Sequence, residues 1–370
     1  MKILVTGVAG FLGSHLAEKL SDLNYEVIGI DNMSGGYKDN VPKKVKFFNF
    51  DCCDLQKMNK AMKGVEVVYH CAATAHEGLS VFSPVEITKN NYMASVSVFT
   101  SAIANKVKRI IFCSSMARYG DQKTPFTEDM NPKPIDPYAI SKKVKRIIFC
   151  SSMARYGSQK IPFTENMLPK PVDPYGISKV AAEDVLKNLC ELNNIEWVIA
   201  VPHNIIGPKQ KYDDPYRNVV SIMINRMLQK KAPIIYGDGK QKRCFSYIDD
   251  CLTCLVPMLD QKNLNREIIN IGPDEEFVTI NKISEICSNI TGNNLAPIYT
   301  KDRPREVKHA TCSADKARKL LNYKTSTDLY TGIKETFEYI KKRGIRPFNY
   351  HINIEIKNEL TPETWLKREI

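Results

Sequence analysis

The 370-residue sequence contains no apolar run that approaches the ~20 residues needed to span a membrane, so we expect no membrane contact. Its first residues, MKILVTG, enter a strand-like pattern at once and leave no room for a signal peptide. The 11 cysteines do not have the spacing of metal ligands, and Cys52 and Cys53 are adjacent rather than arranged as a CxxC redox pair. These absences predict a cytoplasmic protein with reduced thiols and no bound metal.

A long basic tract is also missing, although lysine and arginine outnumber aspartate and glutamate by 53 to 41 and the formal charge is +12. The lysines are scattered, and several are counted twice because a block of sequence is repeated. A solvated surface explains this charge better than a nucleic-acid-binding surface does. We therefore expect no nucleic acid as a partner, whereas an acidic small substrate is compatible with the charge.

Short apolar segments alternate with helical segments through the first 201 residues. Strands are expected at 2–6, 26–30, 46–50, 66–70, 109–113 or 146–150, and 196–201, and helices at 11–23, 92–105 and 175–193. This alternation predicts an α/β fold, a Rossmann-type doubly wound parallel sheet, for residues 1–201. The irregular pattern of residues 202–345 is typical of a smaller C-terminal substrate-binding lobe. Residues 346–370 carry no motif that indicates a role.

A glycine-rich turn directly follows the first expected strand. Gly7, Gly10 and Gly13 permit a tight turn and a close approach of the backbone to a pyrophosphate at a helix N-terminus. Alone, such a triplet could be only a strand–helix turn. Asp31, however, ends the next strand, where a carboxylate accepts hydrogen bonds from a ribose 2′-hydroxyl and repels a 2′-phosphate. The pair predicts NAD rather than NADP as the cofactor.

A second motif, Tyr175-x-x-x-Lys179, stands at the start of an expected helix. The spacing places both side chains on one face, where the lysine cation would lower the pKa of the tyrosine. The phenolate could then act as a general base toward a sugar hydroxyl, with Ser152 donating to the same oxygen. Such a pair alone is usually a coincidence of the helix surface. Together with the glycine turn and Asp31, it indicates a catalytic site.

The same motif occurs twice, because residues 106–142 and 143–179 are identical at 31 of 37 positions. Tyr138 and Lys142 are followed at once by another strand-like segment, so their helix would be short. Tyr175 and Lys179 lead into a long helical segment, and we assign catalysis to this copy. For the serine, the first copy would present Ser115, but the second keeps serine, loop and tyrosine contiguous and favours Ser152. The spare IIFC strand is expected to dock on a sheet edge or on another subunit.

Further segments extend these motifs, namely HCAA at 70–73, SSMARYG, YGISK, PHNIIGPKQ, GDGKQKRCFSYIDD and DRPREVKHATCSADKA. With the glycine turn and Asp31, they resemble extended short-chain dehydrogenases over residues 1–343, most closely nucleotide-sugar 4-epimerases of the UDP-glucose 4-epimerase kind. The resemblance implies a bound NAD, a UDP-sugar substrate and a homodimer.

The resemblance also implies roles for individual residues. Those that would hold or use NAD are Gly7, Gly10, Phe11, Leu12, Gly13, Asp31, Asn32, Asp51, Cys52, Ala72, Asn91, Tyr175 and Lys179. Those that would contact the substrate are Ser80, Asn204, Arg243, Arg303 and Ala310. Asn204 and the two arginines would grip the diphosphate, a role that suits forked guanidinium donors. An exposed salt bridge is the simpler alternative for either arginine.

Some positions depart from the family pattern. The usual Arg-Asp-Phe is Arg243-Cys244-Phe245 here, and Arg-Pro-Gly-Asp is Arg303-Pro304-Arg305-Glu306. Dehydratases and decarboxylases that resemble this family carry an acidic residue just after the catalytic serine, where this chain has Met153-Ala154. Epimerisation at C4 through a 4-keto intermediate is therefore favoured. The alternatives are another NAD-dependent nucleotide-sugar enzyme, a decarboxylase or dehydratase, and a non-catalytic NAD-binding protein disabled by the repeat.

The sugar is predicted from one position. In the family, a bulky tyrosine in the sugar pocket excludes an N-acetyl group, and that position falls on Ala310 here. The small side chain predicts that UDP-linked N-acetylhexosamines are accepted.

Overall fold

The computed structural model describes residues 1–107, 109–113, 146–150, 162–169, 171, 173–193 and 196–370. The predicted catalytic Ser152 and its counterpart Ser115 lie outside the described residues. Tyr138 and Lys142 of the first copy and the Met153-Ala154 pair lie outside them as well.

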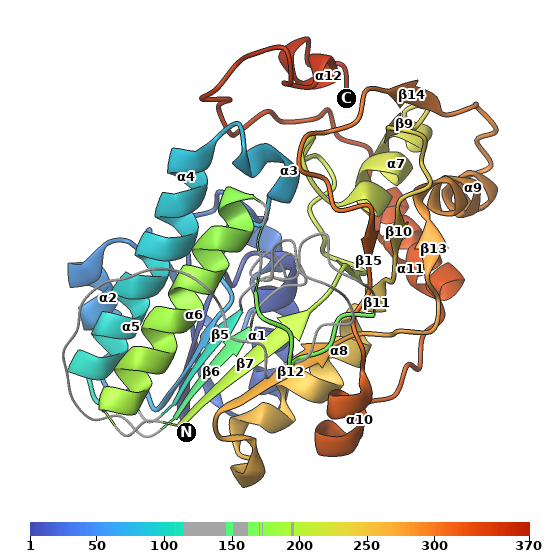
Figure 1. Ribbon diagram of the computed structural model, residues 1–370. Helices are drawn as coiled ribbons and strands as arrows, with labels where there is room; N and C mark the ends of the chain where they lie inside the picture. The colour runs from blue at the N-terminus through green and yellow to red at the C-terminus, as the bar shows by residue number, and fades with distance from the viewer. Residues whose placement is uncertain (108, 114–145, 151–161, 170, 172, 194–195) are drawn as a thin grey trace.

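An eight-stranded parallel sheet forms the larger part of the molecule (Figure 1), with strand order β12-β7-β6-β5-β4-β1-β2-β3. The strands are β1 (Lys2–Thr6), β2 (Glu26–Asp31), β3 (Lys46–Asn49), β4 (Val67–His70), β5 (Arg109–Cys113), β6 (Arg146–Cys150), β7 (Glu196–Pro202) and β12 (Glu267–Ile271). Because side chains alternate along a strand, Leu4 packs into one core cluster and Ile3 and Val5 into another. The apolar run of β1 is thus buried on both faces, as expected of a parallel sheet.

Helices cover both faces of the sheet, which confirms the predicted doubly wound fold. The first core cluster contains residues of α2 (Leu55–Ala61), α5 (Ala94–Ala104) and α6 (Pro174–Leu192). The second contains residues of α1 (Phe11–Asp22), α8 (Ile248–Leu255) and α10 (Asp315–Leu321). In α1, the buried Leu16, Ala17 and Leu20 lie on one helical face, so the sequence pattern itself directs this helix onto the sheet. No helix among the described residues is long and apolar enough to cross a membrane.

The two copies of the RIIFC segment form adjacent strands inside the sheet. β5 and β6 pair in parallel from Arg109↔Arg146 to Cys113↔Cys150, while β4 flanks β5 and β7 flanks β6. The prediction that the spare strand docks on a sheet edge or on another subunit is therefore wrong. An interior position pairs the backbone groups of an apolar strand on both sides, whereas an edge would leave one row unpaired.

A smaller lobe packs beside the carboxyl ends of the sheet strands (Figure 1). A separate core cluster joins its three helices, α7 (Val219–Leu228), α9 (Ile280–Thr291) and α11 (Leu329–Arg343). Its short strands are β8 (Ile205–Ile206), β9 (Ile234–Tyr236), β10 (Lys242–Arg243), β11 (Ser246–Tyr247), β13 (Val278–Thr279), β14 (Ile298–Thr300) and β15 (His309–Ala310). The described residues also form the short helices η1 (Lys38–Asn40), α3 (Glu77–Ser80), α4 (Pro84–Thr88), η2 (Lys89–Met93), η5 (Pro257–Leu259), η6 (Lys262–Leu264) and α12 (Glu363–Leu366).

Residues 346–370, which carry no recognisable motif, join the two parts of the molecule. On the sheet side, Ser83 donates a hydrogen bond to the Asn353 carbonyl at 2.7 Å, and the Glu355 carboxylate accepts from two backbone N–H groups at the start of α4. On the lobe side, Arg226 donates to the Glu369 carbonyl at 2.9 Å. Trp365 is 2% exposed in a fourth core cluster. The C-terminal segment is therefore an integral part of the fold.

Candidate active site

One cavity of about 510 Å³ collects most of the predicted site residues. Its wall combines residues that follow strands β1 to β4, the first turns of α6, residues of the lobe and residues of the C-terminal segment. The predicted residues that line it are Gly7, Gly10, Phe11, Leu12, Gly13, Asp31, Asn32, Asp51, Cys52, Ala72, Tyr175, Lys179, Asn204, Arg243 and Arg303.

The glycines of the turn allow neighbouring backbone segments to approach more closely than a side chain would permit. Gly7 has φ +72°, and a Cβ there would lie 2.8 Å from the Ala72 backbone nitrogen. A Cβ on Gly13 would lie 2.2 Å from the Gly7 carbonyl oxygen. The turn thus brings bare backbone to the cavity at the N-terminus of α1, as a dinucleotide pyrophosphate requires.

Asp31 is held in place by backbone donors at the end of β2. Its Oδ2 accepts from the Ala9 N–H at 2.9 Å and its Oδ1 from the Met33 N–H at 2.7 Å. Burial raises the pKa of Asp31 in spite of these hydrogen bonds. Because each carboxylate oxygen has more than one acceptor site, capacity remains for a ribose diol at the cavity wall. The carboxylate and the glycine turn therefore fit NAD.

Asp51 and Asn32 stand beside Asp31 on the same wall. The Asp51 carboxylate accepts from the Cys53 N–H at 2.8 Å and from the Asn32 side-chain amide at 3.3 Å. Burial alone would raise the pKa of Asp51, but its hydrogen bonds lower it overall. Cys52 is buried, and burial together with nearby carboxylates raises the pKa of its thiol, which is therefore inert at neutral pH.

The predicted base and its cation occupy the start of α6. Tyr175 and Lys179 are buried, 5% and 1% exposed, with the lysine Nζ 5.8 Å from the centre of the tyrosine ring. Asp173 caps the helix by accepting from the Gly176 N–H at 2.9 Å. Burial and the nearby Lys179 cation lower the pKa of His70 well below its usual value, so His70 is neutral.

The two predicted arginines meet at the lobe side of the cavity. Arg303 makes a forked ion pair with Glu306, at 2.8 Å from Nη2 and 3.2 Å from Nε. Arg243 Nη2 lies 4.0 Å from the same carboxylate and donates to the Val307 carbonyl. Burial would raise the pKa of Glu306, but the attraction of Arg303 lowers it overall. Glu306, which departs from the family pattern, thus accepts the two Arg303 hydrogen bonds that were expected to hold a diphosphate.

Three predicted residues do not line the cavity. Asn91 accepts from the Thr74 N–H at 2.7 Å and donates to the Thr74 carbonyl, so it braces the loop that follows β4. Ser80 donates to the Glu77 carbonyl and to Asp173. Ala310 is 5% exposed within a core cluster, and β15 places it opposite Arg243 of β10.

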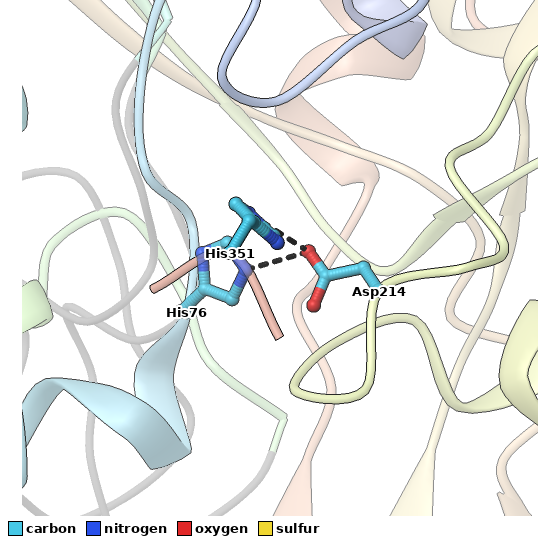
Figure 2. Close-up of side chains that lie close together, drawn as sticks. All are labelled: His76, Asp214 and His351. Atoms are coloured by element: carbon cyan, nitrogen blue, oxygen red, sulfur yellow. Dashed lines mark hydrogen bonds and ion pairs between the residues drawn. The ribbon is translucent and has the colours of Figure 1, made fainter. Parts of the chain in front are cut away.

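Several cavity residues were missed by sequence reasoning. His76, Asp214 and His351 form a compact cluster on the wall (Figure 2). Asp173 is a buried acid, and burial followed by the charge of the neighbouring Glu77 raises its pKa to about 8. The histidine cluster combines positions far apart in the chain, so no local spacing could have revealed it.

The fold and this site define an NAD-binding protein of the short-chain dehydrogenase type. The family described as "NAD dependent epimerase/dehydratase family" matches residues 3–144 and 142–272, two segments that meet at the boundary between the repeat copies. The chain therefore belongs to this family, and its cofactor is NAD.

Individual relatives are nucleotide-sugar enzymes. A Methanocaldococcus jannaschii protein named "Putative UDP-glucose 4-epimerase" is 34% identical over 92% of this chain and 99% of its own length. The UDP-N-acetyl-alpha-D-glucosaminuronate decarboxylase of Bacillus cytotoxicus is 26% identical over 92% and 98%. The crystal structure of the Thermotoga maritima UDP-glucose 4-epimerase with UDP-glucose has a TM-score of 0.78 and 28% identity, over 93% of this chain and 99% of that one. These similarities support an NAD-dependent nucleotide-sugar enzyme.

Proposed function

We propose that the protein interconverts the C4 epimers of a UDP-linked hexose or N-acetylhexosamine. The observation that carries the proposal is the meeting of Tyr175 and Lys179 with Arg243 and Arg303 around the one cavity that also holds the NAD cradle. Similarity to two 4-epimerases supports the same reaction.

The chain's own residues would move the proton and hold the substrate. Tyr175, as a phenolate favoured by the Lys179 cation, would remove the proton of the C4 hydroxyl. NAD, when bound, would supply the hydride chemistry at C4. Tyr175 would then return the proton to the C4 oxygen of the resulting 4-keto sugar, whose opposite face would accept the hydride at C4. Arg243 and Arg303 would hold the diphosphate while the sugar turns, and the Arg303 hydrogen bonds that Glu306 accepts would then pass to phosphate oxygens.

The choice between hexose and N-acetylhexosamine rests on the sequence. Ala310 is buried in a core cluster and does not line the cavity, although it pairs with Arg243, which does. We propose that the protein accepts UDP-N-acetylhexosamines. Their turnover is to be compared with that of the UDP-linked hexoses.

Proton NMR of the sugar products tests the proposed function. The purified protein would be incubated separately with UDP-glucose, UDP-N-acetylglucosamine and UDP-glucuronate, and the C4 epimers would be followed by their anomeric signals. Formation of a C4 epimer supports the proposal. Formation of a UDP-linked pentose with loss of CO2 from UDP-glucuronate would instead identify a decarboxylase, the kind of enzyme that the Bacillus cytotoxicus relative is named as. Bound NAD without any product would contradict catalysis.

A further inference from the structure

Three side chains from distant parts of the chain meet on the cavity wall. His76 precedes α3, Asp214 lies between β8 and α7, and His351 belongs to the C-terminal segment. One ligand atom of each lies within 4.8 Å of the others (Figure 2). The side chains of His76 and Asp214 are only 3% and 2% exposed, and that of His351 is 16% exposed.

The Asp214 carboxylate is oriented toward the two imidazoles. Its Oδ1 accepts from the Tyr216 N–H at 2.9 Å, which fixes the group. Its Oδ2 lies 2.8 Å from His76 Nε2 and 3.9 Å from His351 Nε2. Among the described residues, no lysine or arginine nitrogen lies within 4.0 Å of this carboxylate. Two imidazoles are therefore the side-chain nitrogen partners of this buried carboxylate among the described residues.

The tautomer of His351 determines what lies between it and Asp214. Its Nδ1 lies 3.1 Å from the Asn349 carbonyl oxygen, which can only accept, so Nδ1 carries the hydrogen. In a neutral ring, Nε2 is then a bare lone pair that faces the carboxylate oxygen. A cation between these two acceptors would satisfy both of them. A backbone carbonyl that holds one imidazole nitrogen and frees the other is also the usual support of a metal-binding histidine.

His76 presents a ring nitrogen to the same carboxylate. Its Nε2 lies 2.8 Å from Asp214, so an ion held between the two residues would replace the hydrogen that they share.

We propose that His76, Asp214 and His351 bind a divalent transition-metal ion of the Zn²⁺ class in the cavity wall. Two imidazoles and a carboxylate suit such ions and leave at least one coordination position open. With metal–ligand bonds of about 2.0–2.2 Å, ligand atoms around a tetrahedral ion stand about 3.3 Å apart. The 3.9 Å separation of His351 from Asp214 needs only a small movement of a side chain outside any helix or strand.

The ion would tie the C-terminal segment to both parts of the molecule, and its open position would face the cavity. Sequence analysis predicted no metal because it considered cysteine spacing, and these ligands have no local spacing. The inference does not depend on the proposed epimerase activity, since metal binding is measured without substrate.

Cobalt titration of the chelator-treated, full-length protein is the experiment. We expect one Co²⁺ per chain, visible d–d absorption bands of a low-coordinate site, and displacement by Zn²⁺. His351→Ala should weaken binding at least tenfold, and Asp214→Asn should do the same. His309→Ala is the matched control, because His309 is exposed and lies outside the cluster, and it should bind like the parent.

The outcomes distinguish a metal ion bound by the cluster from a proton held between an imidazole and the Asp214 carboxylate. Circular dichroism and bound NAD would show that each variant is folded, and the partly exposed His351 makes its variant the safer one. Absence of stoichiometric Co²⁺ binding, or equal binding by His351→Ala and the parent, would overturn the proposal and leave a hydrogen-bonded imidazolium at this position.

Discussion

Tyr175 and Lys179 owe their positions to the first turns of α6. Asp173 caps this helix, and the helix then continues for 19 residues across the sheet. Both side chains are thereby buried at the cavity wall with little freedom to move. A catalytic base benefits from such fixed placement, because misplacement by about 1 Å can cost roughly 100-fold in rate.

The first prediction separates the two copies of the motif. Tyr175→Phe removes the group that we propose takes the C4 proton, so kcat should fall at least about 100-fold. Tyr138→Phe is the same change in the other copy and should leave kcat within about twofold, because we assign the proton transfer to Tyr175. Coupled assay or NMR rates of the two variants give the comparison. Loss of activity in the Tyr138 variant alone would assign catalysis to the first copy.

The second prediction concerns the pH dependence of stability. The folded-state pKa of Asp173 is raised to about 8 by burial and by Glu77, so the folded protein holds this proton more tightly than the unfolded chain does. The stability that Asp173 contributes is present below about pH 4 and is lost as pH rises toward about 8. Asp173→Asn keeps the helix cap and removes the titration.

Urea denaturation at pH 6 and pH 8 measures this effect. The decrease in the free energy of unfolding over this interval should be smaller in Asp173→Asn by roughly 1–2 kcal/mol. The exposed Asp260→Asn should retain the decrease of the parent. Identical pH dependence in Asp173→Asn and the parent would contradict the raised pKa.

Among the elements, the paired strands β5 and β6 are the unusual feature. The same five residues occupy both, and their register places each residue opposite its own copy. β5 pairs with β4 and β6 with β7, so either strand alone could bridge these neighbours in the same register. The sheet therefore accommodates a second copy of this strand, because the two copies pair with each other in the register that each uses with its other neighbour.

The third prediction follows from this compatibility. Deletion of residues 106–142 should give a folded protein with a seven-stranded sheet, bound NAD and a melting temperature within about 5 °C of the parent. Deletion of residues 143–179 is the matched control, since the two products differ at only six positions. Circular dichroism and NAD content report the outcome. Insolubility of both products would show that the additional strand is required.

The fourth prediction tests the C-terminal segment. Trp365 is 2% exposed and contacts the rings of Phe82, Tyr216 and Tyr236. Trp365→Ala should lower the free energy of unfolding by about 3–5 kcal/mol. It should also raise KM, because His351 and Ile352 of the same segment line the cavity.

Leu366→Ala is the control for this change, because Leu366 is the next residue and is 43% exposed. Its stability and KM should stay close to those of the parent. Thermal melts and substrate titrations provide both quantities. Equal stability of the two variants would show that the C-terminal segment does not contribute to the fold.

For the whole molecule, sequence reasoning reached the features that depend on local patterns. The strand at 2–6, the glycine turn after it and Asp31 follow from periodicity and from backbone requirements within about 30 residues. The interior position of the spare strand could not be predicted, because pairing is set by competition among distant strands. The contribution of residues 346–370 to the core and to the cavity could not be predicted either, because Trp365 and His351 contact residues that are distant in the sequence.

Proton NMR of the epimerase reaction in D₂O tests the central claim most directly. If Tyr175 moves only the hydroxyl proton and the C4 hydrogen leaves and returns as a hydride, the epimer formed from UDP-glucose or UDP-N-acetylglucosamine retains protium at C4. Bound NAD then exchanges no hydrogen with solvent. Deuterium at C4, or no epimer from any of the UDP-sugars, would contradict the proposed function.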